Sequence, residues 1–284
     1  MAGPGDPVPR SCRGRRPLAS AAQLTFTDCT WWESERVAAG GNRPHLAFWR
    51  QELAGIAHGA GPADATDTDR SGSSRAVRLG SELSDQLRLI ASELGVTPFV
   101  LTLTAFALAV TAEGSAEQVI GVEVAGRTDQ RVADVVGLFI NHVPLRLRRR
   151  PGLTARQAVA ALDDAWRGVL EHSDVSFDTI VDDLGGQRGA GRGPGSDIAF
   201  SYLDARTPPR LDGIRVTPLE PVFNGTAKFG LLLEVFDTPD GLVGVFEHQL
   251  ARFGHGRMTR IRNRWEAMLL GLLADVDVPL DPQG

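Results

Sequence analysis

Several residue types are scarce in this sequence, and each scarcity argues against a class of protein. The 284 residues include two cysteines, Cys12 and Cys29, which provide neither a disulfide framework nor the spacing of a metal-binding motif. Lys228 is the only lysine among 30 basic residues, a skew that we interpret as the signature of a GC-rich genome rather than of phosphate chemistry. The formal net charge of −5 argues against a nucleic-acid-binding protein, which would carry a clustered positive surplus.

Long apolar segments are also missing. The most apolar run, residues 99–112, is too short to span a bilayer and contains three threonines. Four arginines near the amino terminus are not followed by an apolar segment, so no secretory signal is predicted. The sequence therefore predicts a cytoplasmic protein that binds neither a membrane nor a nucleic acid.

The composition predicts a folded chain with a disordered beginning. Hydrophobic residues make up 42% of the sequence, which is enough for one large core or two small ones. Residues 1–22 are rich in Pro, Gly, Ser and Arg without a hydrophobic period, and this pattern predicts a disordered basic tail. A basic arm that contacts an anionic partner is the alternative interpretation.

The hydrophobic periodicity predicts a mixed α/β protein whose sheet is covered by helices. Residues 55–74, which are rich in Gly, Ala, Asp and Ser, are predicted to form a loop or linker. A hairpin is predicted to turn at residues 238–241. Helices are predicted within 30–53 (two, separated at Gly40 and Gly41), 81–94, 98–110, 154–169, 177–184 and 258–272, and strands over 119–124, 143–147, 198–203, 214–219, 229–236 and 242–248.

Five segments resemble, in order, the motifs of one family. Residues 25–37 (TFTDCTWWESERV) and 45–55 (HLAFWRQELAG) resemble a Y-x-D-(Y/F)-A-x-W segment and a Y-W-x-x-x-L helix. Residues 124–148 contain a G-R pair and a stretch similar to V-G-x-F-(V/I)-N-T-x-P-L-R. Residues 171–185 resemble H-Q-D-(V/Y)-P-F-(E/D), and residues 228–249 resemble a K-F-D-L hairpin. Together these segments resemble the condensation domains of nonribosomal peptide synthetases.

The resemblance implies a fold and a division of the chain. The family has the chloramphenicol-acetyltransferase-like architecture, and this chain is similar to a single lobe of it, a mixed sheet covered by helices. Residues 23–74 are expected to form an amino-terminal inter-lobe segment of helices and linker. Residues 75–284 are expected to form the carboxy-terminal lobe.

The resemblance also implies amide formation between two substrates carried as phosphopantetheine thioesters on carrier proteins. The family's diagnostic element is H-H-x-x-x-D-G, whose second histidine acts as a base or positions the amine. No histidine of this sequence is followed by an aspartate four residues later. We therefore interpret the chain as a truncated member, a carboxy-terminal lobe without the lobe that carries the catalytic histidine.

Three residues are implied as lining the substrate channel or floor loop. Arg127 matches an arginine expected to pair with the aspartate of the missing motif, so its partner here would be another chain, Asp129 or Asp134, or solvent. Asn141 is expected to be hydrogen-bonded beside a strand end. His142 replaces the family's usual threonine, which makes it the one candidate for a surrogate catalytic base, although a structural role is the favoured interpretation.

Further motif positions are interpreted as structural. His172 and Asp174 resemble the family's turn before a helix, in which Asp174 could cap the helix. Ser176 stands where the family has proline. In the glycine-rich segment that follows, only Arg188 and Arg192 remain of an R-D-x-S-R-N-P-L motif.

Two functions therefore stay open, and neither requires a bound cofactor or metal. The chain is either a non-catalytic module that binds a carrier protein or synthetase, or one part of an amide-forming enzyme whose H-H-x-x-x-D-G lies on a partner chain. The surface left by a missing lobe would be apolar, which also allows a homo-oligomer. A fragment without a separate role is the third interpretation.

Overall fold

The structure is a computed structural model, and it describes residues 24–56, 69–111, 117–127, 129–148, 150, 152–185, 197–207, 213 and 222–279. The chain divides into two compact units. The smaller unit comprises Met1–Asn42 and Ala125–Phe139, and the larger comprises Arg43–Val124 and Ile140–Gly284. The predicted tail (1–22), the predicted strand at 214–219 and the segment with Arg188 and Arg192 lie outside the described residues.

The smaller unit contains α1 (Phe26–Ala38) and a loop with a short 3-10 helix (Gln130–Val132). Thr25 is the N-cap of α1 and forms a capping box with Asp28. Its hydroxyl accepts from the backbone N–H of Asp28, while the Asp28 carboxylate accepts from the backbone N–H of Thr25. The Phe26 ring packs edge-on against Phe139, with centroids 5.2 Å apart. A Cβ at Gly137 would lie 2.3 Å from the Phe26 ring, so only glycine fits there.

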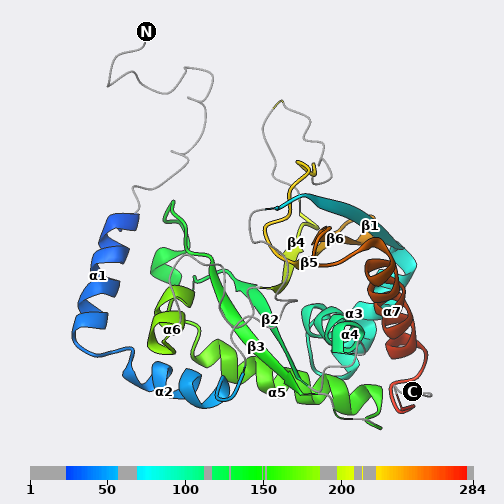
Figure 1. Ribbon diagram of the computed structural model, residues 1–284, viewed down its shortest axis with the longest axis horizontal. Helices are drawn as coiled ribbons and strands as arrows, with labels where there is room; N and C mark the ends of the chain where they lie inside the picture. Colours follow the sequence, from blue (N-terminus) through cyan, green and yellow to red (C-terminus); the bar gives the residue numbers. More distant parts are fainter. Residues whose placement is uncertain are drawn as a thin grey trace. The chain divides into compact units, whose positions relative to one another are not determined.

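The larger unit is built around a six-stranded mixed sheet in the order β1-β6-β5-β4-β2-β3 (Figure 1). Its central strands β2, β4 and β5 are parallel, while β1–β6, β5–β6 and β2–β3 pair antiparallel. The strands span Gly72–Gly80 (β1), Glu117–Val124 (β2), Asn141–Arg148 (β3), Ile198–Asp204 (β4), Leu231–Thr238 (β5) and Gly241–Gln249 (β6).

Helices α3, α4, α5 and α7 pack against one face of this sheet (Figure 1). Eleven of the 14 residues of α4 are buried, which explains why its sequence is apolar on all sides. At the centre of the core, Phe246 of β6 packs edge-on against Trp265 of α7. The helices of this unit span Arg43–Glu52 (α2), Ser81–Glu93 (α3), Pro98–Thr111 (α4), Ala155–Glu171 (α5), Phe177–Asp183 (α6) and His255–Ala274 (α7).

The fold class was predicted correctly, and within the described residues each predicted helix and strand is present. The strand β1 was not predicted, and its first three residues were assigned to a linker. Its sequence, GSSRAVRLG, has little apolar content because β1 is an edge strand that pairs on one side with β6. The predicted hairpin is confirmed, since Thr238 of β5 is paired with Gly241 of β6.

Among the described helices, none is by itself long and apolar enough to cross a membrane. Helices α3 and α4 meet that criterion only as a pair, and they are bent by 101° relative to each other.

Candidate functional site

Asn141, the first residue of β3, connects that strand to the turn between α5 and α6. Its amide nitrogen donates to the carbonyl oxygens of Ser173 and Val175 at 2.9 and 2.8 Å. Its amide oxygen accepts from the backbone N–H groups of His142 and Phe177 at 2.9 and 3.2 Å. The side chain therefore uses both of its donors and both lone pairs on backbone groups. Asn141 is hydrogen-bonded beside a strand end, as predicted, and holds the turn in place.

His142 follows Asn141 on β3 and packs between aromatic rings. Its imidazole stacks on Phe229 with centroids 5.4 Å apart and an interplanar angle of 13°, and it meets Phe177 edge-on at 5.2 Å. His142 is paired across the sheet with Glu123 of β2, so the two side chains lie on the same face. That is the face opposite α3, α4, α5 and α7. These contacts hold the imidazole in one orientation, which suits either a packed residue or a positioned base.

His172 ends α5 and belongs to an aromatic cluster with α2. Its ring stacks on Phe48 at 4.1 Å, and its Nδ1 lies 3.0 Å from Nδ1 of His45. Its carbonyl oxygen accepts a hydrogen bond from the indole of Trp49 at 3.1 Å. Burial and the neighbouring His45 lower the pKa of His172, so the neutral ring is favoured at neutral pH. This environment fits the structural role that the motif implied.

The expectation that Asp174 caps α6 is wrong. Ser176, not Asp174, is the N-cap, and its hydroxyl accepts from the backbone N–H of Thr179 at 3.3 Å. Asp174 lies two residues before this position and is exposed. The departure from the family's proline at 176 therefore has a local physical reason, since serine is among the preferred N-cap residues.

Arg127 lies in the loop of the smaller unit and contacts that loop itself. Its guanidinium donates to the carbonyl oxygens of Val132, Ala133 and Gly137. It also lies over the Phe139 ring, with its central carbon 4.3 Å from the centroid. The expected partners at Asp129 and Asp134 are not those observed, because Asp129 instead pairs with Arg131. The arginine thus orders the backbone of its own loop.

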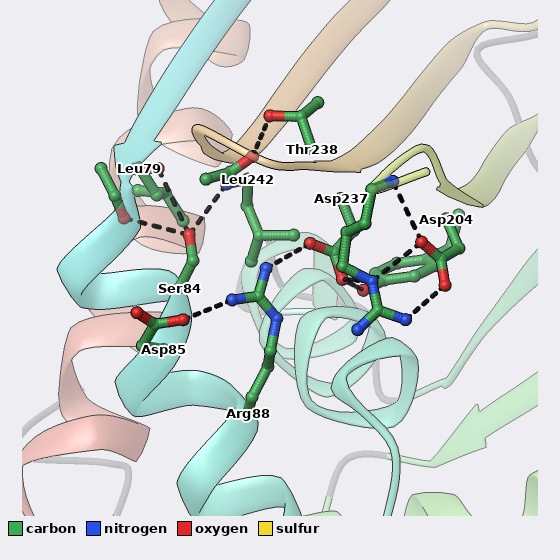
Figure 2. Close-up of polar contacts among 12 residues, drawn as sticks. Leu79, Ser84, Asp85, Arg88, Asp204, Asp237, Thr238 and Leu242 are labelled. Atoms are coloured by element: carbon green, nitrogen blue, oxygen red, sulfur yellow. Dashed lines mark hydrogen bonds and ion pairs between the residues drawn. The ribbon is translucent and has the colours of Figure 1, made fainter. Parts of the chain in front are cut away.

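A buried polar network that the sequence did not reveal joins α3 to the carboxyl ends of β4 and β5 (Figure 2). Asp237 accepts from Arg88 at 2.5 Å and from the Tyr202 hydroxyl at 3.0 Å. Burial and the Asp237 carboxylate raise the pKa of Tyr202, so this phenol stays protonated and donates. Arg206 pairs with Asp204 at the rim of the network. Most of these groups satisfy one another, and Nε of Arg88 is the exception among the described residues, so the network fits a structural role.

The described residues contain no group of three or more His, Cys, Asp or Glu side chains placed to hold a metal ion. Neither Ser201 nor Tyr202 has a histidine hydrogen-bond partner there, so no nucleophile–base pair of the serine-hydrolase kind is formed.

Comparison with known proteins assigns this fold and these motifs to one family. The family model of the condensation domain matches residues 13–282, and the chain belongs to that family. Tyrocidine synthase 3 of Brevibacillus parabrevis is 28% identical over 92% of this chain, which spans 4% of that synthase. Phosphinothricin tripeptide synthetase PhsC of Streptomyces viridochromogenes is 28% identical over 89% of the chain and 24% of its own length.

The solved structures show the same fold. The X-domain from teicoplanin biosynthesis superposes with a TM-score of 0.78 at 22% sequence identity. The superposition covers 94% of this chain and 63% of the X-domain chain. The chain is therefore similar to about two thirds of a solved member of this fold.

Proposed function

We propose that this chain acts in nonribosomal peptide biosynthesis as a condensation-domain module that is non-catalytic by itself and works by binding a carrier protein or synthetase. The observation that carries this proposal is the combination of a family match over residues 13–282 with the absence of any His-x-x-x-Asp in the 284 residues. The phosphopantetheine of the reaction would arrive on the partner carrier protein. The residues 23–74 and 75–284 would serve as inter-lobe segment and carboxy-terminal lobe.

The contacts made by the matched motif residues support the interpretation that the chain keeps the structural scaffold of the family. Asn141, Arg127 and His172 each make specific contacts that order a strand end, a loop and a helix end. A catalytic base would need a pKa near the working pH and hydrogen-bond reach to the reacting amine. His142 is the one motif residue of that type, and its packing against Phe229 and Phe177 accounts for its position without catalysis.

Exposed apolar side chains support a partner-dependent role. Trp31 and Trp32 on α1 are 67% and 61% exposed, and Val136 in the loop of the same unit is 93% exposed. Leu138 is also exposed. Large apolar residues gathered on one small unit are typical of a surface that binds another polypeptide.

The second candidate function is amide formation together with a polypeptide that supplies H-H-x-x-x-D-G. The observation that favours it is Arg127, whose guanidinium is held by three carbonyl oxygens without a carboxylate partner of its own among the described residues. A carboxylate brought by such a polypeptide would complete the charge pair that the family resemblance implies.

Self-association through the exposed apolar residues of the smaller unit, which are Trp31, Trp32, Val136 and Leu138, is an outcome that light scattering would detect.

Calorimetric titration of the chain with a cognate holo-carrier protein tests the first proposal. We expect saturable heat with the holo form and weaker heat with the apo form, which lacks the phosphopantetheine arm. The absence of heat with every carrier protein of the same biosynthetic system would contradict it. Product formation after adding a separate H-H-x-x-x-D-G polypeptide, but not before, would establish the second candidate instead.

A further inference from the structure

The larger unit contains a cavity between α4, α5 and the end of β3. Four residues of α4 line it at the spacing i, i+3, i+4 and i+7 from Thr104 to Thr111, and four residues of α5 line it at the same spacing from Ala158 to Ala165. Residues at this spacing share one face of a helix, so each helix presents one face to the cavity. Four of these eight residues are alanines, whose short side chains leave a volume of about 160 Å³ unfilled.

The inner wall of the cavity is apolar. Leu147 of β3 and Leu162 of α5 belong to the hydrophobic core and line it. The hydroxyls of Thr104 and Thr111 donate to carbonyl oxygens of their own helix at 2.7 and 2.8 Å, so their hydrogens are already used. Such a wall offers few polar partners to water, and a cavity of about 150 Å³ between aliphatic side chains binds a group of the size of benzene. The inner part therefore fits a hydrocarbon group of about six carbons.

The opening of the cavity is positively charged. The lining residues that are exposed are Arg148, Arg150 and Gly152, so the cavity opens beside the arginines that follow β3. Arg146, which also lines it, shares the carboxylate of Glu117 with Arg148 at 2.6 and 3.4 Å. Nε of Arg146 and the whole guanidinium of Arg150 have no hydrogen-bond or ion-pair partner in the part of the chain that the structure describes. Three cations thus share one carboxylate, and no described carboxylate lines the cavity itself.

We propose that this cavity binds an organic anion with an unbranched hydrocarbon chain of about six carbons, such as a medium-chain carboxylate. The chain would lie between α4 and α5, where its burial supplies most of the binding free energy. The anionic head group would stay at the exposed opening beside Arg150, where it keeps part of its hydration and is attracted by the uncompensated positive charge. A cationic head group would be repelled there.

This site is separate from the candidate functional site. Its lining contains none of the motif residues Arg127, Asn141, His142 and His172. The inference therefore adds a second binding site to the chain, and it does not depend on the proposed role in peptide biosynthesis.

Calorimetric titration of the whole chain with heptanoate, whose hydrocarbon tail matches that length, tests the assignment. Heptan-1-ol, heptylammonium and acetate are the comparison probes. We expect saturable binding of heptanoate and at least about fivefold weaker binding of the alcohol, which lacks the charge. Heptylammonium should show no saturable binding. Acetate should bind at least about a hundredfold more weakly, because it has no methylene group to bury.

Filling the cavity should abolish binding without unfolding the protein. Ala161→Leu places its added carbons in the cavity, so heptanoate binding should weaken at least about tenfold while thermal melting stays unchanged or rises. Ala160→Leu is the matched control, because Ala160 is the exposed neighbour on α5 and does not line the cavity. Its binding should equal that of wild type. Ala165→Leu makes the same change one helical turn further along the lining face.

A charge variant tests the opening. Arg150→Gln should weaken heptanoate binding by about fivefold, as for one ion pair at the surface, and should leave binding of heptan-1-ol unchanged. Arg43→Gln, at an exposed position of α2, makes the same change in net charge away from the lining residues and should have no effect.

The inference would be overturned by the absence of saturable heptanoate binding, or by equal binding of heptan-1-ol or heptylammonium. Full binding by a folded cavity-filling variant, or by folded Arg150→Gln protein, would also contradict it. These measurements involve no carrier protein, so the failure of this inference is distinguishable from the failure of the proposed function.

Discussion

Arg88 on α3 and Asp237 at the end of β5 form a salt bridge of 2.5 Å between residues 149 positions apart in the sequence. The Asp237 side chain is 3% exposed, and Figure 2 shows Arg88 between Asp237 and Asp85. Through this pair the helical layer is attached to the carboxyl end of the parallel strands. The pair is therefore a point at which the structure is sensitive to substitution.

Replacing Arg88 with leucine should lower the free energy of unfolding by about 3 kcal/mol, because it leaves a buried carboxylate without its principal cation. Urea denaturation followed by circular dichroism measures this loss. Arg206→Leu is the matched control, because Arg206 is half exposed and pairs mainly with exposed Asp204, so it should cost about 1 kcal/mol or less. Equal losses for the two variants would contradict the assigned importance of the Arg88–Asp237 pair.

Replacing Asn141 should loosen the turn between α5 and α6. Asn141→Ala removes four hydrogen bonds to backbone groups, and a loss of about 2 kcal/mol is expected. Asn141→Ala removes the oxygen that accepts from the Phe177 N–H, so amide hydrogen exchange at Phe177 should accelerate in that variant. Asn141→Asp keeps this oxygen but places an acceptor against the carbonyl oxygens of Ser173 and Val175. Unchanged exchange in a destabilised variant would show that Asn141 does not hold this turn.

His248 should make the protein less stable in mild acid. It is 2% exposed, both ring nitrogens lack partners among the described residues, and burial with nearby His255 lowers its pKa. The unfolded chain, with the usual histidine pKa of 6.5, then binds more protons, so stability is complete above that pH and is lost as the pH falls below it.

Comparing wild type with His248→Phe by thermal unfolding at pH 8 and pH 5.5 measures this effect. The variant should lose less stability between the two pH values, and His172, whose pKa is also lowered, should account for part of what remains. Identical pH dependence in the two proteins would show that His248 is not responsible.

Glu234→Gln should stabilise the protein at neutral pH. The raised pKa of Glu234 means that folding favours its neutral form, a contribution present below the usual value of 4.5 and lost as the pH rises through the folded-state pKa. The glutamine variant should therefore melt higher than wild type at pH 7, with the difference disappearing near pH 4. A lower melting temperature at pH 7 would mean that the carboxylate has a compensating partner.

Local signals predicted much of the fold. The helices predicted at 154–169 and 98–110 are present as α5 and α4. Thr154 and Gln157 form a capping box at the start of α5, and Pro98 is the first residue of α4, directly after Thr97. The strand β1 could not be recognised from the sequence. An edge strand needs no apolar residues on its outer side, and it does not need them along the full length of its inner side. Its pairing with β6 is formed by residues about 170 positions away.

Adjacency across the sheet could not be predicted from the sequence. Glu123, Ser201 and Glu234 are adjacent only because β4 lies between β2 and β5 in the sheet, an order that periodicity does not encode. Ser201 in the sequence is a polar residue in an apolar strand, which is a weak signal. By contrast, the place of Asn141 beside a strand end and the motif that contains His172 pointed to structural roles for both, although most of their partners lie 32 to 127 positions away in the sequence.

The most direct test of the account is a condensation assay with the chain alone. Donor and acceptor substrates would be presented as thioesters on holo-carrier proteins, and peptide product would be measured by mass spectrometry. The account predicts binding of the carrier protein without peptide formation, since no His-x-x-x-Asp is present in the sequence. Peptide product formed by the chain alone, and abolished in a folded His142→Ala variant, would contradict it and establish His142 as a catalytic residue.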